Sequence, residues 1–282
     1  MSLEIKNIDK NYKDKKALDN ITITIEPNKI YGLLGRNGAG KSTLLNVINN
    51  RSVPSSGDVL LDGNTLLDNE VTLNQVYLMS EDNLFPSTMK VKDMFKISEQ
   101  FYGSFDWDLA EKMLEEFELT KKTTFKKLST GYRSIAKLII ALCVPCDYIF
   151  LDEPVLGLDA AHRELFYEFL IETYETSPRT FIISTHLIEE ITNLLESVII
   201  IDKGKVSVAE DVSTILETSF TLSGPKTSVL AAVKDSEILG QEELGDFISV
   251  HITGQLPDNF SNDISVSPLN LQNYFVQLTK RK

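Results

Sequence analysis

The chain has 282 residues, of which 42% are hydrophobic, enough for one large domain or a large and a small one with a sizeable core. Its 28 basic and 41 acidic side chains give a net charge of −13, which argues against a nucleic-acid-binding protein with a basic face. No stretch reaches the roughly 18 consecutive apolar residues of a membrane span. The first residues do not resemble a signal peptide. We therefore expect a cytosolic protein, or one held on the cytosolic side of a membrane by a partner.

The pattern of apolar residues predicts strands alternating with helices over residues 1–214. Strands are expected at 3–9, 21–26, 30–34, 57–63, 76–79, 147–151, 180–184 and 198–201. Helices are expected at 42–48, 91–102, 109–119, 160–174 and 187–195. Alternation of this kind implies a mostly parallel sheet with covered faces. The helical pattern from about residue 88 to 145 predicts a helical subdomain inserted into this α/β sheet.

A composition shift near residue 215 predicts a second, smaller unit over residues 215–282. Its expected strands are 220–222, 238–244, 247–252 and 263–266, and its expected helices are 227–234 and 269–278. The last helix is amphipathic, and we expect it to pack on its own small sheet. The sequence thus predicts a small C-terminal α+β domain.

Residues 35–42 read Gly-Arg-Asn-Gly-Ala-Gly-Lys-Ser and fit G-x-x-x-x-G-K-[ST], the loop that binds nucleotide phosphates. An expected strand precedes the loop and an expected helix follows it, as this site requires. Glycines let backbone N–H groups converge on the phosphates, and the helix N-terminus adds partial positive charge. Lys41 would reach the β- and γ-phosphates, and the Ser42 hydroxyl would bind Mg²⁺. The residues predicted to bind nucleotide in this segment are Asn37, Gly38, Ala39, Gly40, Lys41, Ser42 and Thr43. The sheet is therefore predicted to be of the P-loop NTPase type, with a nucleotide and Mg²⁺ bound, and the loop alone leaves kinases, GTPases and ATPases open.

A second motif, formed by two acidic residues, follows the apolar strand at 147–151. Asp152 at the end of this strand is predicted to lie beside the Mg²⁺ ion, and the adjacent Glu153 is placed to polarise an attacking water. Phosphoryl transfer needs mainly charge neutralisation and a positioned nucleophile, which these carboxylates and Lys41 supply. The residues predict a nucleotide-hydrolysing enzyme.

The segment Leu128-Ser129-Thr130-Gly131-Tyr132 lies between these two motifs. With it, residues 3–214 resemble the ATP-binding subunits of ABC transporters, whose signature is typically Leu-Ser-Gly-Gly-Gln. The resemblance implies that Ser129 and Gly131 contact the γ-phosphate held by the other subunit, so that two ATP molecules are sandwiched in a head-to-tail dimer.

The same resemblance assigns three further residues. Tyr12 lies where an aromatic ring usually stacks on adenine, and Asp159 belongs to the loop that crosses the dimer. His186 matches the switch histidine that contacts the γ-phosphate and, with Glu153, is expected to be catalytic.

The chain departs from the family pattern at several positions. The family usually has a Gln after the strand at 76–79, and here Ser80 holds that position with Glu81 beside it. Ser80 is too short to replace Gln without a bridging water, whereas Glu81 would reach the metal after a small shift in register. Thr130 replaces a Gly and Tyr132 replaces a Gln in the signature. Since Lys41 and the two catalytic carboxylates are present, we still expect hydrolysis.

The resemblance implies a separate transmembrane permease that docks in a groove beside residues 80–95, and a peripheral position on the cytoplasmic face of the membrane. We expect the chain to power export by closing on ATP as a homodimer, or as a heterodimer with a paralogue, without binding nucleic acid. The alternative is a soluble ABC-type ATPase that acts on ribosomes or DNA, against which the net charge of −13 weighs. The substrate is not encoded in these motifs.

Overall fold

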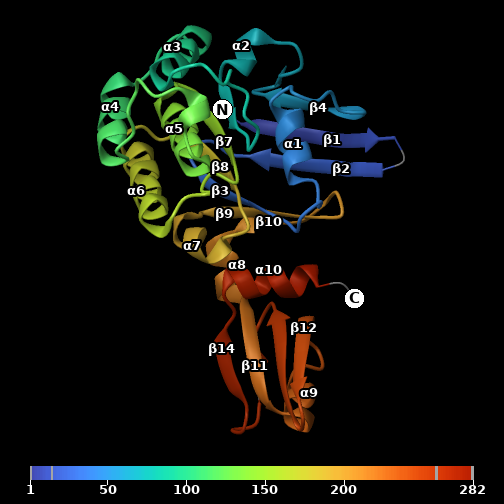
Figure 1. Cartoon of the computed structure of the whole chain (residues 1–282). Helices are drawn as coiled ribbons and strands as arrows, with labels where there is room; N and C mark the ends of the chain where they lie inside the picture. The colour runs from blue at the N-terminus through green and yellow to red at the C-terminus, as the bar shows by residue number, and fades with distance from the viewer. Residues whose placement is uncertain (1, 14, 258–259, 281–282) are drawn as a thin grey trace.

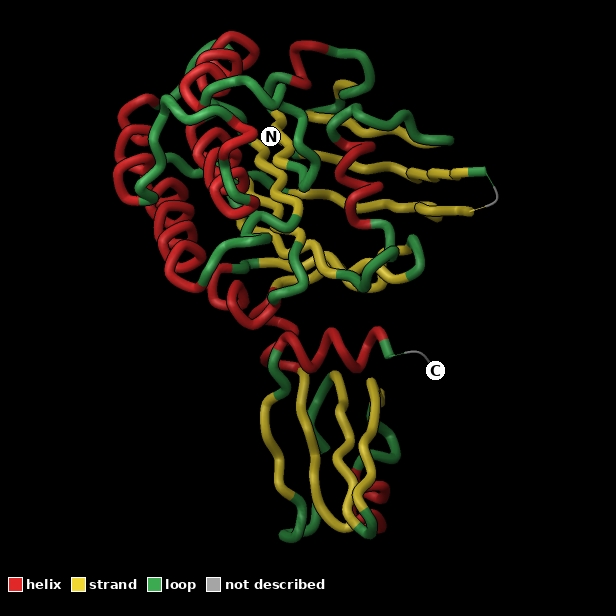
Figure 2. Tube along the Cα trace, in the orientation of Figure 1, coloured by secondary structure: helices red, strands yellow, loops and turns green. Residues whose placement is uncertain are grey.

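The computed structural model describes residues 2–13, 15–257 and 260–280. The outermost ends of the two expected domains, residues 1 and 282, lie outside this part. A large α/β body carries a small β-rich unit below it, and a helix near the C-terminus lies between the two (Figures 1 and 2). In the described residues, no helix has the length and hydrophobicity that crossing a membrane requires.

The centre of the large body is a six-stranded sheet in the order β10-β9-β3-β8-β7-β6. Its strands are β3 (Ile30–Leu34), β6 (Val76–Met79), β7 (Tyr148–Asp152), β8 (Thr180–Ser184), β9 (Ser197–Asp202) and β10 (Lys205–Asp211). All neighbours are parallel except β10 and β9. Every residue of β3, β6, β7 and β8 is buried, as expected for parallel strands covered on both faces. The carboxyl ends of these strands therefore meet along one edge.

An antiparallel sheet, ordered β2-β1-β4-β5, lies beside the central one. Its strands are β1 (Leu3–Tyr12), β2 (Lys15–Ile25), β4 (Ser56–Leu61) and β5 (Asn64–Thr65). Two helices belong to this part of the chain: α1 (Lys41–Ile48) follows β3, and the short α2 (Glu70–Leu73) follows β5. The inward side chains of β1 and β2 form a second buried cluster together with apolar residues of α1.

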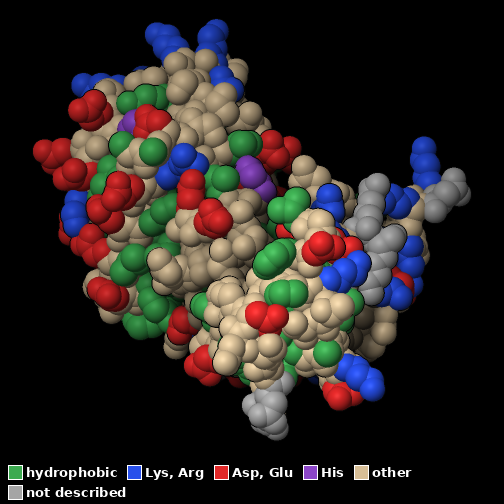
Figure 3. Space-filling view, turned by 90° about the horizontal axis from the view of Figure 1, so that it is seen from below, with side chains coloured by type: hydrophobic (Ala, Val, Ile, Leu, Met, Phe, Trp, Pro, Cys, Tyr) green, Lys and Arg blue, Asp and Glu red, His purple; other side chains and the backbone are tan. Residues whose placement is uncertain are grey.

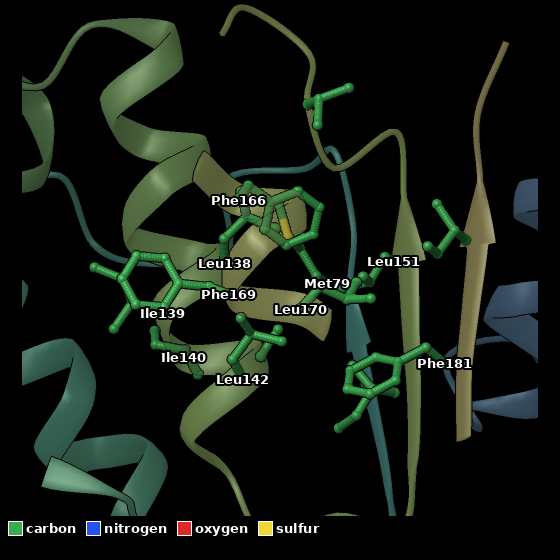
Figure 4. Close-up of a cluster of buried hydrophobic side chains, with 14 of the residues drawn as sticks. Met79, Leu138, Ile139, Ile140, Leu142, Leu151, Phe166, Phe169, Leu170 and Phe181 are labelled. Carbon is green, nitrogen blue, oxygen red and sulfur yellow. The ribbon is translucent and has the colours of Figure 1, made fainter. Parts of the chain in front are cut away.

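The helices on the other side of the central sheet are α3 (Val91–Tyr102), α4 (Trp107–Glu116), α5 (Thr130–Cys143), α6 (Ala160–Thr176) and α7 (Ile188–Ile191), with 3-10 turns at Phe125–Lys127 and Thr192–Leu194. Asp106 caps α4 as expected, because its carboxylate accepts a hydrogen bond from the Leu109 N–H. Apolar side chains of α5 and α6 pack against β6, β7 and β8 (Figure 4). The acidic side chains at the left of Figure 3 lie on the side of the molecule formed by α4 and α6. The helix expected at 187–195 is divided into α7 and the second 3-10 turn.

The small unit is a four-stranded antiparallel sheet in the order β12-β13-β11-β14. Its elements are β11 (Ser219–Pro225), α9 (Lys226–Ala232), β12 (Glu237–Leu244), β13 (Phe247–Thr253), β14 (Ser265–Pro268) and α10 (Leu271–Thr279). The expected boundary between residues 214 and 215 falls inside the connecting helix α8 (Val212–Thr218). The fold class is confirmed: a P-loop α/β sheet with a helical subdomain, followed by a small α+β unit.

The amphipathic C-terminal helix contacts β12 of its own small sheet, as expected, and it also packs against the large body. Leu271 and Tyr274 of α10 belong to the buried cluster of the large body, and Phe275 and Leu278 pack against that cluster. The small sheet has its own core, which includes Leu222 and Val250 and is covered by α9. α10 thus lies between the small sheet and the large body, and its apolar side chains join the buried cluster of the large body.

Candidate functional site

The phosphate loop leaves the buried strand β3 and turns directly into α1. Gly40 precedes the helix with φ 118°, and a Cβ there would lie 2.8 Å from the Ala17 carbonyl oxygen, so only glycine fits this close approach. No side chain caps α1. Its first backbone N–H groups are therefore available to an anion, and the helix dipole adds to their attraction.

Lys41 lies inside the loop, with 8% of its surface exposed. Its ammonium donates a hydrogen bond to the Gly35 carbonyl oxygen at 2.7 Å. Burial lowers the pKa of Lys41, whereas the nearby carboxylates of Glu153 and Asp152 oppose this shift by favouring the charged form. A bound phosphate group would add its negative charge to those of Glu153 and Asp152 and further favour the charged ammonium.

The loop forms one wall of a cavity of about 390 Å³ at the carboxyl edge of the central sheet. The acids Glu81, Asp152 and Glu153 also line it. The predicted nucleotide-binding residues in the lining are Asn37, Gly38, Ala39, Gly40, Lys41, Ser42 and Thr43. The fold thus brings the two motifs together across more than 100 residues of sequence.

Glu153 follows the last residue of β7 and is held in an uncommon backbone conformation, with φ 48°. Its N–H donates to the Ser184 carbonyl oxygen at 2.8 Å, which fixes it to the neighbouring strand β8. One carboxylate oxygen, Oε2, lies 2.9 Å from Nδ1 of His186. The two expected catalytic side chains are therefore hydrogen-bonded to each other, and His186 itself is exposed.

Ser80 and Glu81 have different surroundings. The Ser80 side chain is buried and accepts a hydrogen bond from Nη1 of Arg51 at 2.9 Å. The ammonium of Lys137 in α5 donates to the backbone carbonyls of Ser80 (2.9 Å) and Glu81 (3.1 Å). Burial lowers the pKa of Lys137, against the opposing effect of Asp82 and Glu81. This clamp leaves Glu81, and not Ser80, in the lining of the phosphate cavity.

The signature residues do not line that cavity. Ser129 caps α5, since its Oγ accepts a hydrogen bond from the Tyr132 N–H. A Cβ at Gly131 would lie 2.6 Å from the Gly157 carbonyl oxygen, so this glycine allows the loop after Glu153 to pack against the start of α5. Within one chain, the signature therefore lies apart from the phosphate loop.

Asp159 caps α6. Its carboxylate accepts a hydrogen bond from the His162 N–H at 2.9 Å and lies 3.0 Å from the ring Nδ1 of the same residue. These contacts lower the pKa of Asp159, chiefly through the backbone hydrogen bond.

Tyr12 lies at the end of β1, about half exposed and outside the cavity lining. The ammonium of Lys10 lies 4.9 Å from the centre of its ring. One face of the ring is thus occupied by a cation.

The oxygen-bearing side chains at the phosphate cavity fit Mg²⁺ only if phosphate is present. In the part of the chain that the structure describes, His, Cys, Asp and Glu side chains form no group of three or more that could hold a metal ion by itself. The residues in the cavity lining with side-chain oxygens suited to Mg²⁺ are Ser42, Asp152 and Glu81. Mg²⁺ is commonly held by one or two carboxylates together with substrate phosphates, which agrees with this arrangement.

Three basic residues around the site had no role in the sequence-based prediction. Arg51 and Lys137 hold the segment at Ser80, and Arg36 lines the cavity while its guanidinium donates a hydrogen bond to the Thr279 carbonyl oxygen. Arg36 lies within the phosphate-loop motif, but at a position where the motif accepts any residue type. The partners of the other two are distant in sequence, and no local pattern marks them.

Known proteins resemble this chain in sequence. The family model described as ABC transporter matches residues 18–156. The ABC transporter ATP-binding protein YtrB of Bacillus subtilis is 24% identical over 282 residues, covering 97% of each chain. The Nod factor export ATP-binding protein I of Cupriavidus metallidurans is 30% identical over 210 residues, covering 72% of this chain and 69% of that protein.

A solved structure shares the fold of the large body. It is the dimeric, post-hydrolysis state of an ATP-binding cassette bound to ADP and Pi, with a TM-score of 0.66 and 22% identity, covering 74% of this chain and 98% of the other. The phosphate loop, the paired carboxylates and these matches lead to one conclusion: the chain belongs to the ATP-binding subunits of ABC transporters and is an ATPase that hydrolyses ATP.

Proposed function

We propose that the chain hydrolyses ATP with Glu153 as the general base and His186 as its partner. The observation that carries this proposal is the 2.9 Å contact between the two side chains at the cavity lined by Lys41. The loop N–H groups and Lys41 bind the phosphates, and Glu153 orients and deprotonates the attacking water. His186, hydrogen-bonded to Glu153, stabilises charge on the γ-phosphate.

Ser42 and Asp152 would hold Mg²⁺ together with phosphate oxygens, and Glu81 is the additional acid at the same cavity. The ion supplies charge neutralisation at the β- and γ-phosphates when it is bound. Tyr12 stacks on adenine with the ring face that Lys10 leaves open.

Three residues are proposed to act across the interface between two subunits: Ser129, Gly131 and Asp159. They lie outside the phosphate cavity of their own chain, which agrees with a role at the cavity of a second subunit. Closure of two subunits around two ATP molecules would complete both sites, with the partner being a second copy or a paralogue. The dimeric form of the cassette bound to ADP and Pi supports this arrangement.

Glu153→Gln tests the role of the base. The substitution keeps the size of the side chain and its ability to bond His186, but it removes the base. We expect multiple-turnover ATP hydrolysis to fall by about 10²–10⁴-fold while ATP binding is kept. Glu168→Gln, on the exposed side of α6, is the matched control and should hydrolyse ATP normally. Hydrolysis by Glu153→Gln at the rate of the control would disprove the assignment.

Sedimentation of Glu153→Gln tests the sandwich. We expect a monomer without nucleotide and a dimer with ATP and Mg²⁺, because bound ATP is not consumed. A monomer under both conditions, with ATP bound, would refute closure of the chain with itself alone and would mean that closure needs the membrane subunit or a paralogue.

We further propose that residues 1–214 form the ATPase domain and residues 215–282 a separate unit. The ATPase domain would dock a transmembrane permease at the cytoplasmic face of the membrane and power export. The relative named for Nod factor export supports this direction. Leu84, which is 64% exposed in the segment between β6 and α3, is a suitable position for a photo-crosslinking residue. Crosslinking of a membrane-spanning protein in native membranes would support docking there, and crosslinking of soluble proteins alone would contradict it.

A further inference from the structure

The last helix, α10, is held between the large body and the small sheet (Figures 1 and 2). Its apolar residues Leu271 and Tyr274 are buried in the cluster of the large body. It also contacts α7, which begins two residues after His186. One side of α10 therefore packs close to a segment that borders the nucleotide site.

The C-terminal end of α10 reaches the phosphate loop itself. Nη1 of Arg36 donates a hydrogen bond to the Thr279 carbonyl oxygen at 3.1 Å. The last carbonyl groups of a helix lack donors within the helix and carry partial negative charge, so a guanidinium is a favourable partner for them. Since Arg36 also lines the phosphate cavity, a single side chain joins the cavity rim to α10.

The same end of α10 is bonded to the small sheet. Glu242 of β12 accepts hydrogen bonds from Nζ of Lys280 at 2.8 Å and from Nε2 of Gln277 at 3.1 Å. The pKa of Glu242 is lowered, chiefly by its hydrogen bond with Lys280. Consecutive residues, Thr279 and Lys280, thus connect the phosphate loop to β12.

We propose that α10 positions Arg36 at the rim of the phosphate cavity, so that ATP binding and docking of the C-terminal unit strengthen each other. The inference rests on the proposed binding of phosphate by the loop at residues 35–43. Held by Thr279, the guanidinium adds a fixed positive charge beside the phosphates. Because coupling between two binding events is reciprocal, bound ATP should in turn hold α10 more firmly against the loop.

Hydrogen–deuterium exchange of residues 271–280 tests the coupling. The measurement uses the full chain carrying Glu153→Gln, with and without ATP and Mg²⁺, so that nucleotide is not consumed. We expect ATP to slow exchange in α10 about 5-fold, within the usual range of coupling between sites. Adding Arg36→Ala should remove this protection, and Arg36→Lys, which keeps a charged donor, should restore part of it.

Kinetics of the chain with Glu153 intact provide the second readout. Arg36→Ala should raise KM for ATP about 5-fold and leave kcat within about 2-fold, because positioning affects phosphate binding more than the chemical step. Lys112→Ala, which removes an exposed ion pair with Glu172 on α4 and α6, should change neither KM nor the exchange of α10.

The two proposals fail in different ways. If the Glu153→Gln chain does not bind ATP in a calorimeter, the proposed nucleotide site is wrong. If ATP binds but α10 exchanges equally with and without it, or if Arg36→Ala leaves both KM and the protection of α10 unchanged, the coupling is refuted and the nucleotide site stands.

Discussion

Lys137 provides the sharpest test of how the segment at Ser80 is held. Its side chain lies in the middle of α5, with 7% of the residue exposed, and bonds two consecutive backbone carbonyls, those of Ser80 and Glu81. We predict that Lys137→Met destabilises the fold and slows hydrolysis. Methionine has a similar volume, so the substitution removes the hydrogen bonds without opening a large cavity.

The magnitude follows from two opposing effects. A hydrogen bond to a charged group contributes about 1.5–3 kcal/mol to stability, and Lys137 makes two of them. Burial lowers the pKa of this ammonium, which shows that the fold also disfavours its charge, and the variant escapes that penalty. We therefore expect a net loss of about 2 kcal/mol, well below the sum of two bonds. Residues that support a ligand of a metal site typically change activity 10–100-fold, so ATP hydrolysis should fall about 10-fold.

Urea unfolding followed by circular dichroism measures the first effect, and steady-state phosphate release measures the second. Lys112→Met is the matched control, because Lys112 is exposed and its contacts, an ion pair with Glu172 and a cation–π contact with the ring of Phe169, lie at the surface of α4 and α6. That control should change stability by less than about 1 kcal/mol and leave hydrolysis unchanged. If Lys137→Met unfolds and hydrolyses ATP like Lys112→Met, the reasoning about the clamp is wrong.

Three further predictions concern other parts of the chain. Ser80→Ala should keep the rate of ATP hydrolysis within about 2-fold of the parent protein. Glu81→Ala should weaken the dependence on Mg²⁺ and slow hydrolysis about 10-fold, as expected for a residue at the metal site. A larger loss of hydrolysis in Ser80→Ala than in Glu81→Ala would assign the metal-site role to Ser80. Gly131→Ala should abolish ATP-driven dimerisation without affecting ATP binding to the single chain, because its Cβ would lie 2.6 Å from the Gly157 carbonyl oxygen and displace the signature; normal dimerisation would contradict this account. Burial lowers the pKa of His251, so the unfolded chain binds a proton that the folded chain does not as the pH falls through about 6.5, and stability should decline there. Urea midpoints at pH 8 and pH 5.5 should therefore differ less in His251→Gln than in the parent protein, and an equal difference would show that His251 is not responsible.

Most of the local structure could be predicted from the sequence. The strands at 76–79 and 180–184 and the helix at 91–102 lie where their patterns placed them. Apolar periodicity reports which residues of an element are buried, and these elements have continuous patterns. By contrast, β10 (Lys205–Asp211) was not predicted, because its polar, partly exposed residues resemble a loop and only pairing with β9 makes it a strand.

The chemistry of this protein is predicted by two short segments of its sequence. These segments are the phosphate loop and the Asp152–Glu153 pair. Because binding phosphate and activating water require particular residue types at fixed spacing, both segments can be recognised without knowledge of the fold. Tertiary structure decided the partners of residues far apart in the chain, such as Lys137 with Ser80 and Arg36 with Thr279. The fold also places α10 against the large body in addition to its own sheet, because an amphipathic pattern indicates that one side is buried but not which surfaces cover it.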